Sequence, residues 1–196
     1  MPATAQQQRV IEAEDLLRFE LVFDPQISPS GRRVVFGVKK VGSQNNYQTQ
    51  LHVMDLEEGT SRAFTRGEKD HSPRWSPDGQ QIAFVGTRSE QQPQIYLIPA
   101  QGGEARALTR FPEGSIGKFC WSPQGQCLAV AFRITDTEWT REAVKQRETT
   151  GASEPPKEID QLWYRLDGDG YFQQQRYGLY LIDIETGEHR LLYNKD

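Results

Sequence analysis

The sequence predicts an all-β protein, a partial β-propeller of about three four-stranded antiparallel blades. Three observations predict it: a repeated turn, a repeated strand block, and central strands that are apolar on both faces. The turn is the motif Ser-Pro-x-Gly, found at Ser28–Gly31, Ser76–Gly79 and Ser122–Gly125. Successive copies start 48 and 46 residues apart, and an internal period in this range is typical of propeller blades. Three blades are fewer than a closed ring needs, so the sequence reads as part of something larger.

The chemistry of the motif favours a tight turn between two strands. In Ser76–Gly79 the serine can hydrogen-bond back to the chain, the proline presets φ at the second position, and the glycine completes the turn. Trp75 and Ile82 are therefore expected to flank a hairpin. A second hairpin in each unit ends at a glycine for which positive φ is expected, namely Gly59, Gly103 and Gly187.

The second half of each unit aligns without a gap over 16 residues. The blocks are Leu51–Arg66, Ile95–Arg110 and Leu179–Asn194, and their apolar and glycine positions coincide. Together with the two strands around the Ser-Pro turn, each block completes a unit of four antiparallel strands.

The two middle strands of each unit are apolar on both faces, as in Ile82–Val85 and Ile95–Ile98 of the second unit. An antiparallel sheet with one wet face alternates apolar and polar residues. Both faces are therefore expected to be covered by neighbouring sheets, as in radially stacked blades. A two-sheet sandwich, the alternative, predicts more polar outward positions than these strands have.

The elements follow one another with two breaks in the repeat. The first is a lead-in with a short helical segment, for which Val10–Val22 is the candidate. The second separates two strands of blade three by about 43 residues, and a connection of this length is usually functional or a contact surface. The expected units are the lead-in 1–25, blade one 26–66, blade two 67–110 and blade three 111–196 with an insertion at 134–176.

Within the insertion, Asp136 or Thr137 is expected to cap a short charged helix that runs to Arg147. A hairpin closed by Asp167–Gly170 is expected further on. An aromatic cluster in this region either lines a substrate passage or packs the insertion against blade three, and packing is favoured. Its members are Trp139, Trp163, Tyr164, Tyr171 and Phe172.

Composition excludes several partners. The net charge is −4 and no Lys/Arg-rich run is present, so no nucleic acid is expected. No stretch approaches the roughly 20 apolar residues of a membrane helix, so no membrane is expected as a partner. Residues 1–9 lack the apolar core of a signal peptide, which makes the cytoplasm the expected location.

Neither a metal nor a cofactor is expected. Cys120 and Cys127 lack companions for a tetrahedral metal site; two free thiols on the solvent side are favoured over a cross-strand disulfide. Asp167–Gly170 is similar to a fragment of a calcium loop but lacks the later bidentate glutamate. Gly102-Gly103 is explained by its hairpin rather than by a phosphate loop.

Three segments taken together suggest a family. They are Glu14–Leu17 leading to Asp24–Pro29, the block WSPDGQQIAFVGTR with QIYLIPAQGGEARALT, and LWYRLDGDGYF before GLYLIDIETGEHRLL. Over nearly the whole chain they resemble the N-terminal propeller of the prolyl oligopeptidase family, in its acylaminoacyl-peptidase and dipeptidyl-peptidase-like branch. The blade motif alone is also similar to that of the periplasmic propeller of the Tol-Pal system; the opening segment and the Tyr-Arg-x-Asp-Gly insertion point to the peptidases.

This resemblance implies a two-domain serine hydrolase, in which a propeller of commonly seven blades precedes an α/β-hydrolase domain with a Ser-Asp-His triad. The sequence stops at Asp196, after the last strand of blade three, so about four blades and the hydrolase domain are absent. No triad residue is carried over. The expected function is that of a non-catalytic propeller portion that gates the access of short peptides to the missing domain, and Arg165 could meet a peptide carboxylate in the complete enzyme.

A direct search for a nucleophile agrees. Ser115, in Glu113–Gly117, has Glu where the Gly-x-Ser-x-Gly elbow needs its first glycine, and it is expected in a loop between blades two and three. Structural or solvated roles are expected for the three histidines, His52 and His189 in strands and His71 in an inter-blade loop. No catalytic residue is therefore assigned, and the substrate-binding residues are unknown.

Two other functions are open. One is a stand-alone binding or scaffold module similar to the Tol-Pal propeller, which would complete its ring by self-association into a homo-oligomer. The other is a self-contained hydrolase, for which neither a nucleophile nor a base is found.

Overall fold

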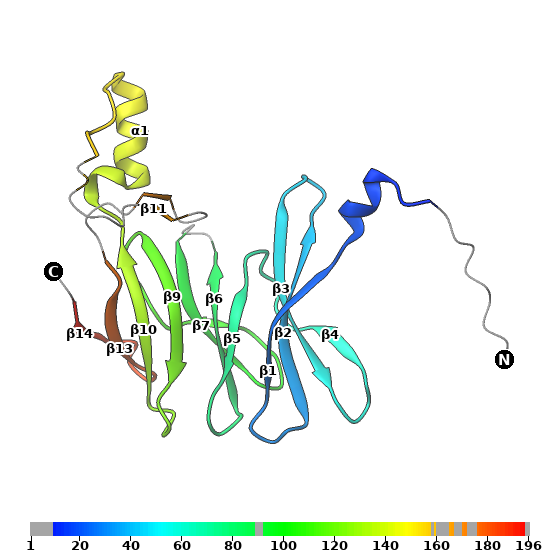
Figure 1. Cartoon of the computed structure of the whole chain (residues 1–196). Coiled ribbons are helices and arrows are strands. Elements are labelled where there is room, and N and C mark those ends of the chain that lie inside the picture. The colour runs from blue at the N-terminus through cyan, green and yellow to red at the C-terminus, as the bar shows by residue number, and fades with distance from the viewer. Residues whose placement is uncertain are drawn as a thin grey trace.

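A computed structural model describes residues 10–88, 92–157, 159, 165–166, 170–171 and 176–194. These residues form three four-stranded sheets that stand side by side in chain order (Figure 1). Every pairing between neighbouring strands is antiparallel. The all-β class and the partial propeller of three blades are therefore confirmed.

Each sheet is one blade, and its strands are neighbours in the order in which the chain makes them. Blade one contains β1 (Leu21–Ile27), β2 (Arg33–Val41), β3 (Tyr47–Asp55) and β4 (Ser61–Ala63). Blade two contains β5 (His71–Trp75), β6 (Gln81–Thr87), β7 (Pro93–Pro99) and β8 (Arg106–Ala107). Blade three contains β9 (Gly114–Trp121), β10 (Cys127–Ile134), β13 (Gly178–Asp183) and β14 (His189–Tyr193).

The Ser-Pro turns have the expected geometry. The amide of Gly79 donates to the carbonyl oxygen of Ser76 at 2.9 Å, and Trp75 pairs with Ile82 across the hairpin. Gly79 has a φ of 70°, a value that glycine adopts without steric cost. The glycines that end the second hairpin of each blade also have positive φ, as predicted: 67° for Gly59, 124° for Gly103 and 72° for Gly187.

The lead-in contains a short helical segment inside Val10–Val22, as predicted. It is a 3-10 helix, η1, which spans Ala13–Arg18, and none of its residues is buried. β1 then begins at Leu21, inside the segment expected as the lead-in. The reason is strand pairing: Val22 and Phe23 pair with β2, and the ring of Phe23 covers Gly37 so closely that a Cβ there would lie 2.4 Å from it.

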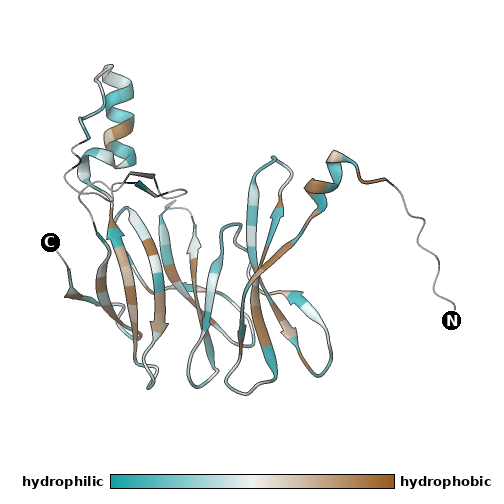
Figure 2. Ribbon diagram, in the orientation of Figure 1, coloured by the Kyte–Doolittle hydropathy of each residue, from teal (hydrophilic) through white to brown (hydrophobic). Residues whose placement is uncertain are grey.

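Two hydrophobic clusters lie between the blades, and β6 contributes to both. Ile82 and Phe84 belong to the cluster shared with blade one, whereas Ala83 and Val85 belong to the cluster shared with blade three. The central strands of blade two are consequently buried on both faces, as predicted. Figure 2 shows apolar segments on strands of all three blades.

Blades one and three are buried on one face only. Along β10, buried residues alternate with partly exposed ones, although its sequence is apolar at nearly every position. Each of these blades has one neighbouring sheet, and its other face has no second sheet to pack against among the described residues.

The connection between β10 and β13 contains η2 (Thr137–Trp139), α1 (Arg141–Thr150) and a short hairpin of β11 (Arg165–Leu166) and β12 (Gly170–Tyr171). The helix begins later than predicted. Thr140, rather than Asp136 or Thr137, caps α1 by accepting a hydrogen bond from the amide of Ala143. The predicted aromatic residues Trp163, Tyr164 and Phe172 lie outside the described residues. Trp139 is half-buried and stacks against the cations of Arg147 and Lys157.

Candidate functional site

Ser115 has the geometry of an ordinary strand residue. It lies within β9, not in the loop where it was predicted, and its main chain pairs with Arg133 of β10. A nucleophile elbow requires a sharp turn from a strand into a helix. β9 leads instead into the next strand of its own sheet, so Ser115 is not presented as a nucleophile would be.

The three histidines lie in three different strands. His52 lies in β3 beside Phe36, and His189 lies in β14, where its ring contacts Phe111 and Tyr180. His71 was predicted in a loop but is the first residue of β5, and its Nδ1 lies 3.0 Å from Ser72 Oγ. Burial lowers the pKa of both His52 and His71. The structure does not bring these rings together with Ser115 into a catalytic group.

Other chemistry is likewise not assembled in the described part of the chain. Cys120 is exposed and Cys127 partly buried, and both are free thiols. No group of three or more His, Cys, Asp or Glu side chains in this part is arranged to hold a metal ion. None of the helices described is both long and apolar enough to span a membrane.

A repeated hydrogen bond ties each blade to the one before it. The indole Nε1 of Trp75 donates to the carbonyl oxygen of Gln26 at 3.0 Å, and that of Trp121 donates to the carbonyl oxygen of Arg74 at 3.0 Å. Each tryptophan precedes a Ser-Pro turn, and each acceptor lies just before the equivalent position of the preceding blade. The next acceptor in this series is the carbonyl of Cys120, to which a further blade would donate.

The apolar contacts repeat in the same way. Four positions of each blade face the blade that follows. In blade one they are Val35, Leu51, Val53 and Phe64, and in blade two they are Ala83, Ile95, Leu97 and Leu108; all eight are buried. The equivalents in blade three are Ala129, Leu179, Leu181 and Leu192, of which Leu179 is 40% exposed and Leu192 is 45% exposed.

An arginine also repeats at the last strand of each blade. Arg62 donates to the carbonyl oxygen of Gln101 at 3.3 Å, and Arg106 donates to that of Ile184 at 3.0 Å, each in the blade that follows. Arg190 holds the equivalent position in blade three and has no partner among the described residues. We call the Cys120 carbonyl, the four apolar side chains of blade three and Arg190 the forward face of blade three.

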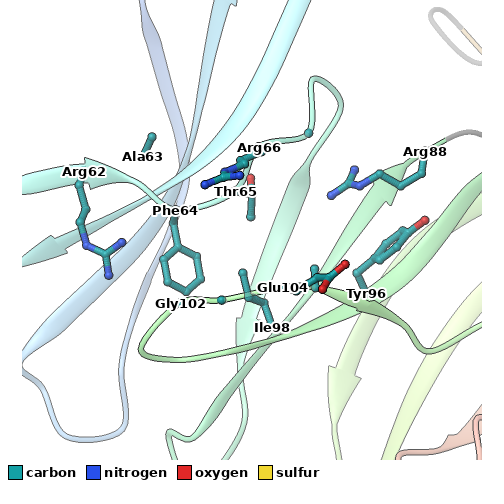
Figure 3. Close-up of a pocket in the computed structure, with 13 residues that line it drawn as sticks. Arg62, Ala63, Phe64, Thr65, Arg66, Arg88, Tyr96, Ile98, Gly102 and Glu104 are labelled. Atoms are coloured by element: carbon teal, nitrogen blue, oxygen red, sulfur yellow. The ribbon is translucent and has the colours of Figure 1, made fainter.

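A cleft of about 970 Å³ opens between blades one and two (Figure 3). Its lining includes three arginines, one glutamate and an apolar floor. The arginines are Arg62, Arg66 and Arg88, the glutamate is Glu104, and Phe64, Tyr96 and Ile98 make the floor. Sequence reasoning missed this cleft, although the repeat alignment carries a signal for it: small residues stand where the next junction has large ones.

Comparisons with known proteins agree with this geometry. The TolB beta propeller domain matches residues 4–155. The uncharacterized peptidase YuxL of Bacillus subtilis is 33% identical over 187 residues, which cover 94% of this chain and 28% of that protein. The acylaminoacyl peptidase of Pyrococcus horikoshii superposes with a TM-score of 0.70 at 19% identity, over 92% of this chain and 25% of its own.

A putative TolB from Agrobacterium tumefaciens superposes less well. Its TM-score is 0.54 at 20% identity, over 85% of this chain and 47% of its own. The chain spans about a quarter of the length of YuxL and of the acylaminoacyl peptidase.

Proposed function

The chain belongs to the TolB beta propeller domain family and is a propeller of the kind that peptidases similar to acylaminoacyl peptidase carry. We propose that it gates the access of short peptides to a serine-hydrolase domain. The gate needs the remaining blades and that domain, which are the partners we propose. By itself the chain is a non-catalytic portion. We place it in the cytoplasm, where two free thiols such as Cys120 and Cys127 persist.

The observation that carries this proposal is the forward face of blade three. Its acceptor, its apolar positions and its arginine repeat those that join blade one to blade two and blade two to blade three. A surface that repeats two inter-blade contacts position by position is suited to a further blade. Contiguous apolar surface of this kind is otherwise uncommon on a soluble monomer.

Ring closure by a second copy is less well supported. The face that a second copy would present is that of blade one, where Ile27 stands in the place of Trp75 and Trp121 and is 66% exposed. The side chain of Ile27, unlike an indole, has no N–H to donate to the Cys120 carbonyl of its neighbour. The putative TolB also superposes on this chain less well than the acylaminoacyl peptidase does, which favours the peptidase-type propeller over a stand-alone module.

Two measurements on the purified chain test the proposal. Light scattering after size exclusion should show that the chain associates without a fixed stoichiometry, and a hydrophobic dye should bind to it. The double variant Leu179→Asp with Leu181→Asp should reduce both the association and the dye binding. A discrete oligomer that excludes the dye would support the self-closing module instead. The chain should also leave ester and short-peptide substrates intact, and hydrolysis that is lost in Ser115→Ala would overturn the non-catalytic role.

A further inference from the structure

The cleft between blades one and two has a filled counterpart between blades two and three. There, four rings close the space at the end of the hydrophobic cluster. Phe111 stacks on Phe132 with ring centroids 4.2 Å apart, and it also contacts Tyr180 at 5.7 Å and His189 at 5.4 Å. No side chain can enter such a stack without displacing a ring.

Three of these four rings are missing at the first junction. The repeat alignment places Gly67 at the position of Phe111, Gly86 at that of Phe132 and Ala105 at that of His189, and only the tyrosine is kept, as Tyr96. Gly67, Tyr96 and Ala105 line the cleft. The cleft therefore results from the loss of side-chain volume at defined positions of the repeat.

An arginine reaches into the vacated space and is held there rigidly. Arg88 Nη1 lies 2.6 Å from Asp70 Oδ1 and Nη2 lies 3.2 Å from Oδ2, and the guanidinium lies 4.8 Å from the centre of the Tyr96 ring. The Asp70 side chain is fully buried and also accepts a hydrogen bond from the amide of Gly67. These contacts fix both the position and the orientation of Arg88.

The two glycines make this arrangement possible. A Cβ at Gly67 would lie 2.4 Å from atoms of both Asp70 and Arg88, and one at Gly86 would lie 2.6 Å from Asp70 Oδ1. The residues that empty the cleft are thus the same residues that admit the ion pair. Loss of packing alone would leave an empty space between the blades. Here a buried carboxylate also orients a guanidinium in that space, which favours a binding role for the cleft.

The lining keeps a positive excess after this pair is formed. The charge of Arg88 is neutralised by Asp70. Of the other charged residues in the lining, Arg62 and Arg66 are positive and Glu104 is negative, so one net positive charge remains. Arg66 has no partner among the described residues. Figure 3 shows Arg66 and Arg88 on two sides of the cleft, with Phe64 and Ile98 below them.

We propose that this cleft binds a carboxylate-bearing ligand with a flat or apolar body. Arg66 would donate to the carboxylate, Arg88 would add a fixed positive charge, and Phe64 and Tyr96 would cover the body. A guanidinium matches the two oxygens of a carboxylate in a planar fork. An apolar lining with a few directed polar groups, at a volume of about 300–1,000 Å³, is typical of sites for small molecules.

The test uses benzoate and its neutral isostere benzamide, titrated calorimetrically into the full chain at about pH 8, where imidazoles are neutral. Benzoate should bind and benzamide should bind about tenfold more weakly, because only benzoate can form charge-assisted hydrogen bonds. Arg66→Gln should weaken benzoate by about tenfold. Arg110→Gln is the matched control, since Arg110 is the equivalent exposed arginine beside the filled junction and should leave binding unchanged.

A variant that fills the cleft but keeps its charges tests whether binding needs the open space. Ala105→His places at the first junction the side chain that helps fill the second, keeps every arginine, and should abolish benzoate binding without lowering the thermal stability. The inference is overturned if benzamide binds as tightly as benzoate, or if Arg66→Gln and Arg110→Gln behave alike. It is also overturned if Ala105→His leaves binding intact, or if inorganic phosphate competes as well as benzoate does.

Discussion

The indole nitrogen of Trp121 lies 3.0 Å from the carbonyl oxygen of Arg74, in the blade before its own. The bond joins two sheets that share no strand pairing, so its loss acts on the packing of blade against blade. Trp75 and Gln26 repeat it at the other junction.

Trp121→Phe is expected to lower the free energy of unfolding by about 1–2 kcal/mol, because the carbonyl of Arg74 loses the indole donor and the smaller ring leaves a gap between the blades. Urea unfolding followed by circular dichroism measures this. Trp139→Phe is the control, since Trp139 lies in η2 and joins no two blades. Equal losses in the two variants would show that the inter-blade bond is not what Trp121 contributes.

Arg88→Gln is expected to destabilise the protein by about 3 kcal/mol, because it leaves the buried carboxylate of Asp70 without its cation. Arg32→Gln, which removes an ion pair to Glu57 exposed on both sides, should cost about 0.5 kcal/mol or less. Chemical unfolding of the two variants under the same conditions measures the difference. A loss for Arg88→Gln no larger than for Arg32→Gln would contradict the rigid pair in the cleft.

Two glycines at equivalent hairpin positions should respond differently to alanine. Gly59 and Gly187 have φ values of 67° and 72°, so alanine strains the backbone at both, by about 1 kcal/mol. At Gly187 a Cβ would also lie 2.5 Å from the carbonyl oxygen of Leu108, whereas at Gly59 it meets open space. Thermal unfolding should therefore show the larger loss for Gly187→Ala, and equal losses would argue that blades two and three do not approach so closely.

Stability should depend on pH through His71. Burial lowers its pKa below the usual 6.5, and the neighbouring Asp70 and Asp24 only partly oppose this. The unfolded chain therefore binds this proton more readily than the folded one, so the contribution of His71 is present above 6.5 and is lost as pH falls below it. His71→Gln should lose less stability than the wild type between about pH 7.5 and about pH 5.5. Parallel losses in the two proteins would contradict a partly buried imidazole that stays neutral in the folded state.

Much of the fold could be predicted from sequence because the determinants are local and repeated. The Ser-Pro-x-Gly turn sets the hairpin between Trp75 and Ile82, and the glycine of each second hairpin has the positive φ that its position requires. Where the local sequence pattern did not distinguish a helix from a strand, pairing with a neighbouring strand decided the structure. Val22 ends a segment whose mixed apolar and charged residues favour a helix, yet it joins β1 because β2 offers a ladder of backbone partners.

The candidate site could not be predicted from the residues one at a time. Gly67 and Gly86 read as ordinary loop and strand glycines until they are aligned with Phe111 and Phe132. Even then the sequence does not show that Asp70 is fully buried beneath Arg88, which depends on how two blades pack. The prediction of central strands covered on both faces likewise holds for blade two alone, because β10 has a neighbouring sheet on only one face among the described residues.

Hydrogen–deuterium exchange, read strand by strand, tests most directly whether the chain is an open arc of a larger ring. Amides of β6 and β7, covered on both faces, should exchange slowest, and those of β13 and β14 should exchange markedly faster, because opening a strand with one bare face exposes less buried surface. Protection of β13 and β14 equal to that of β6 and β7, measured on the monomeric fraction of the purified chain, would mean that the forward face of blade three is already covered within a single chain. That result would contradict the account.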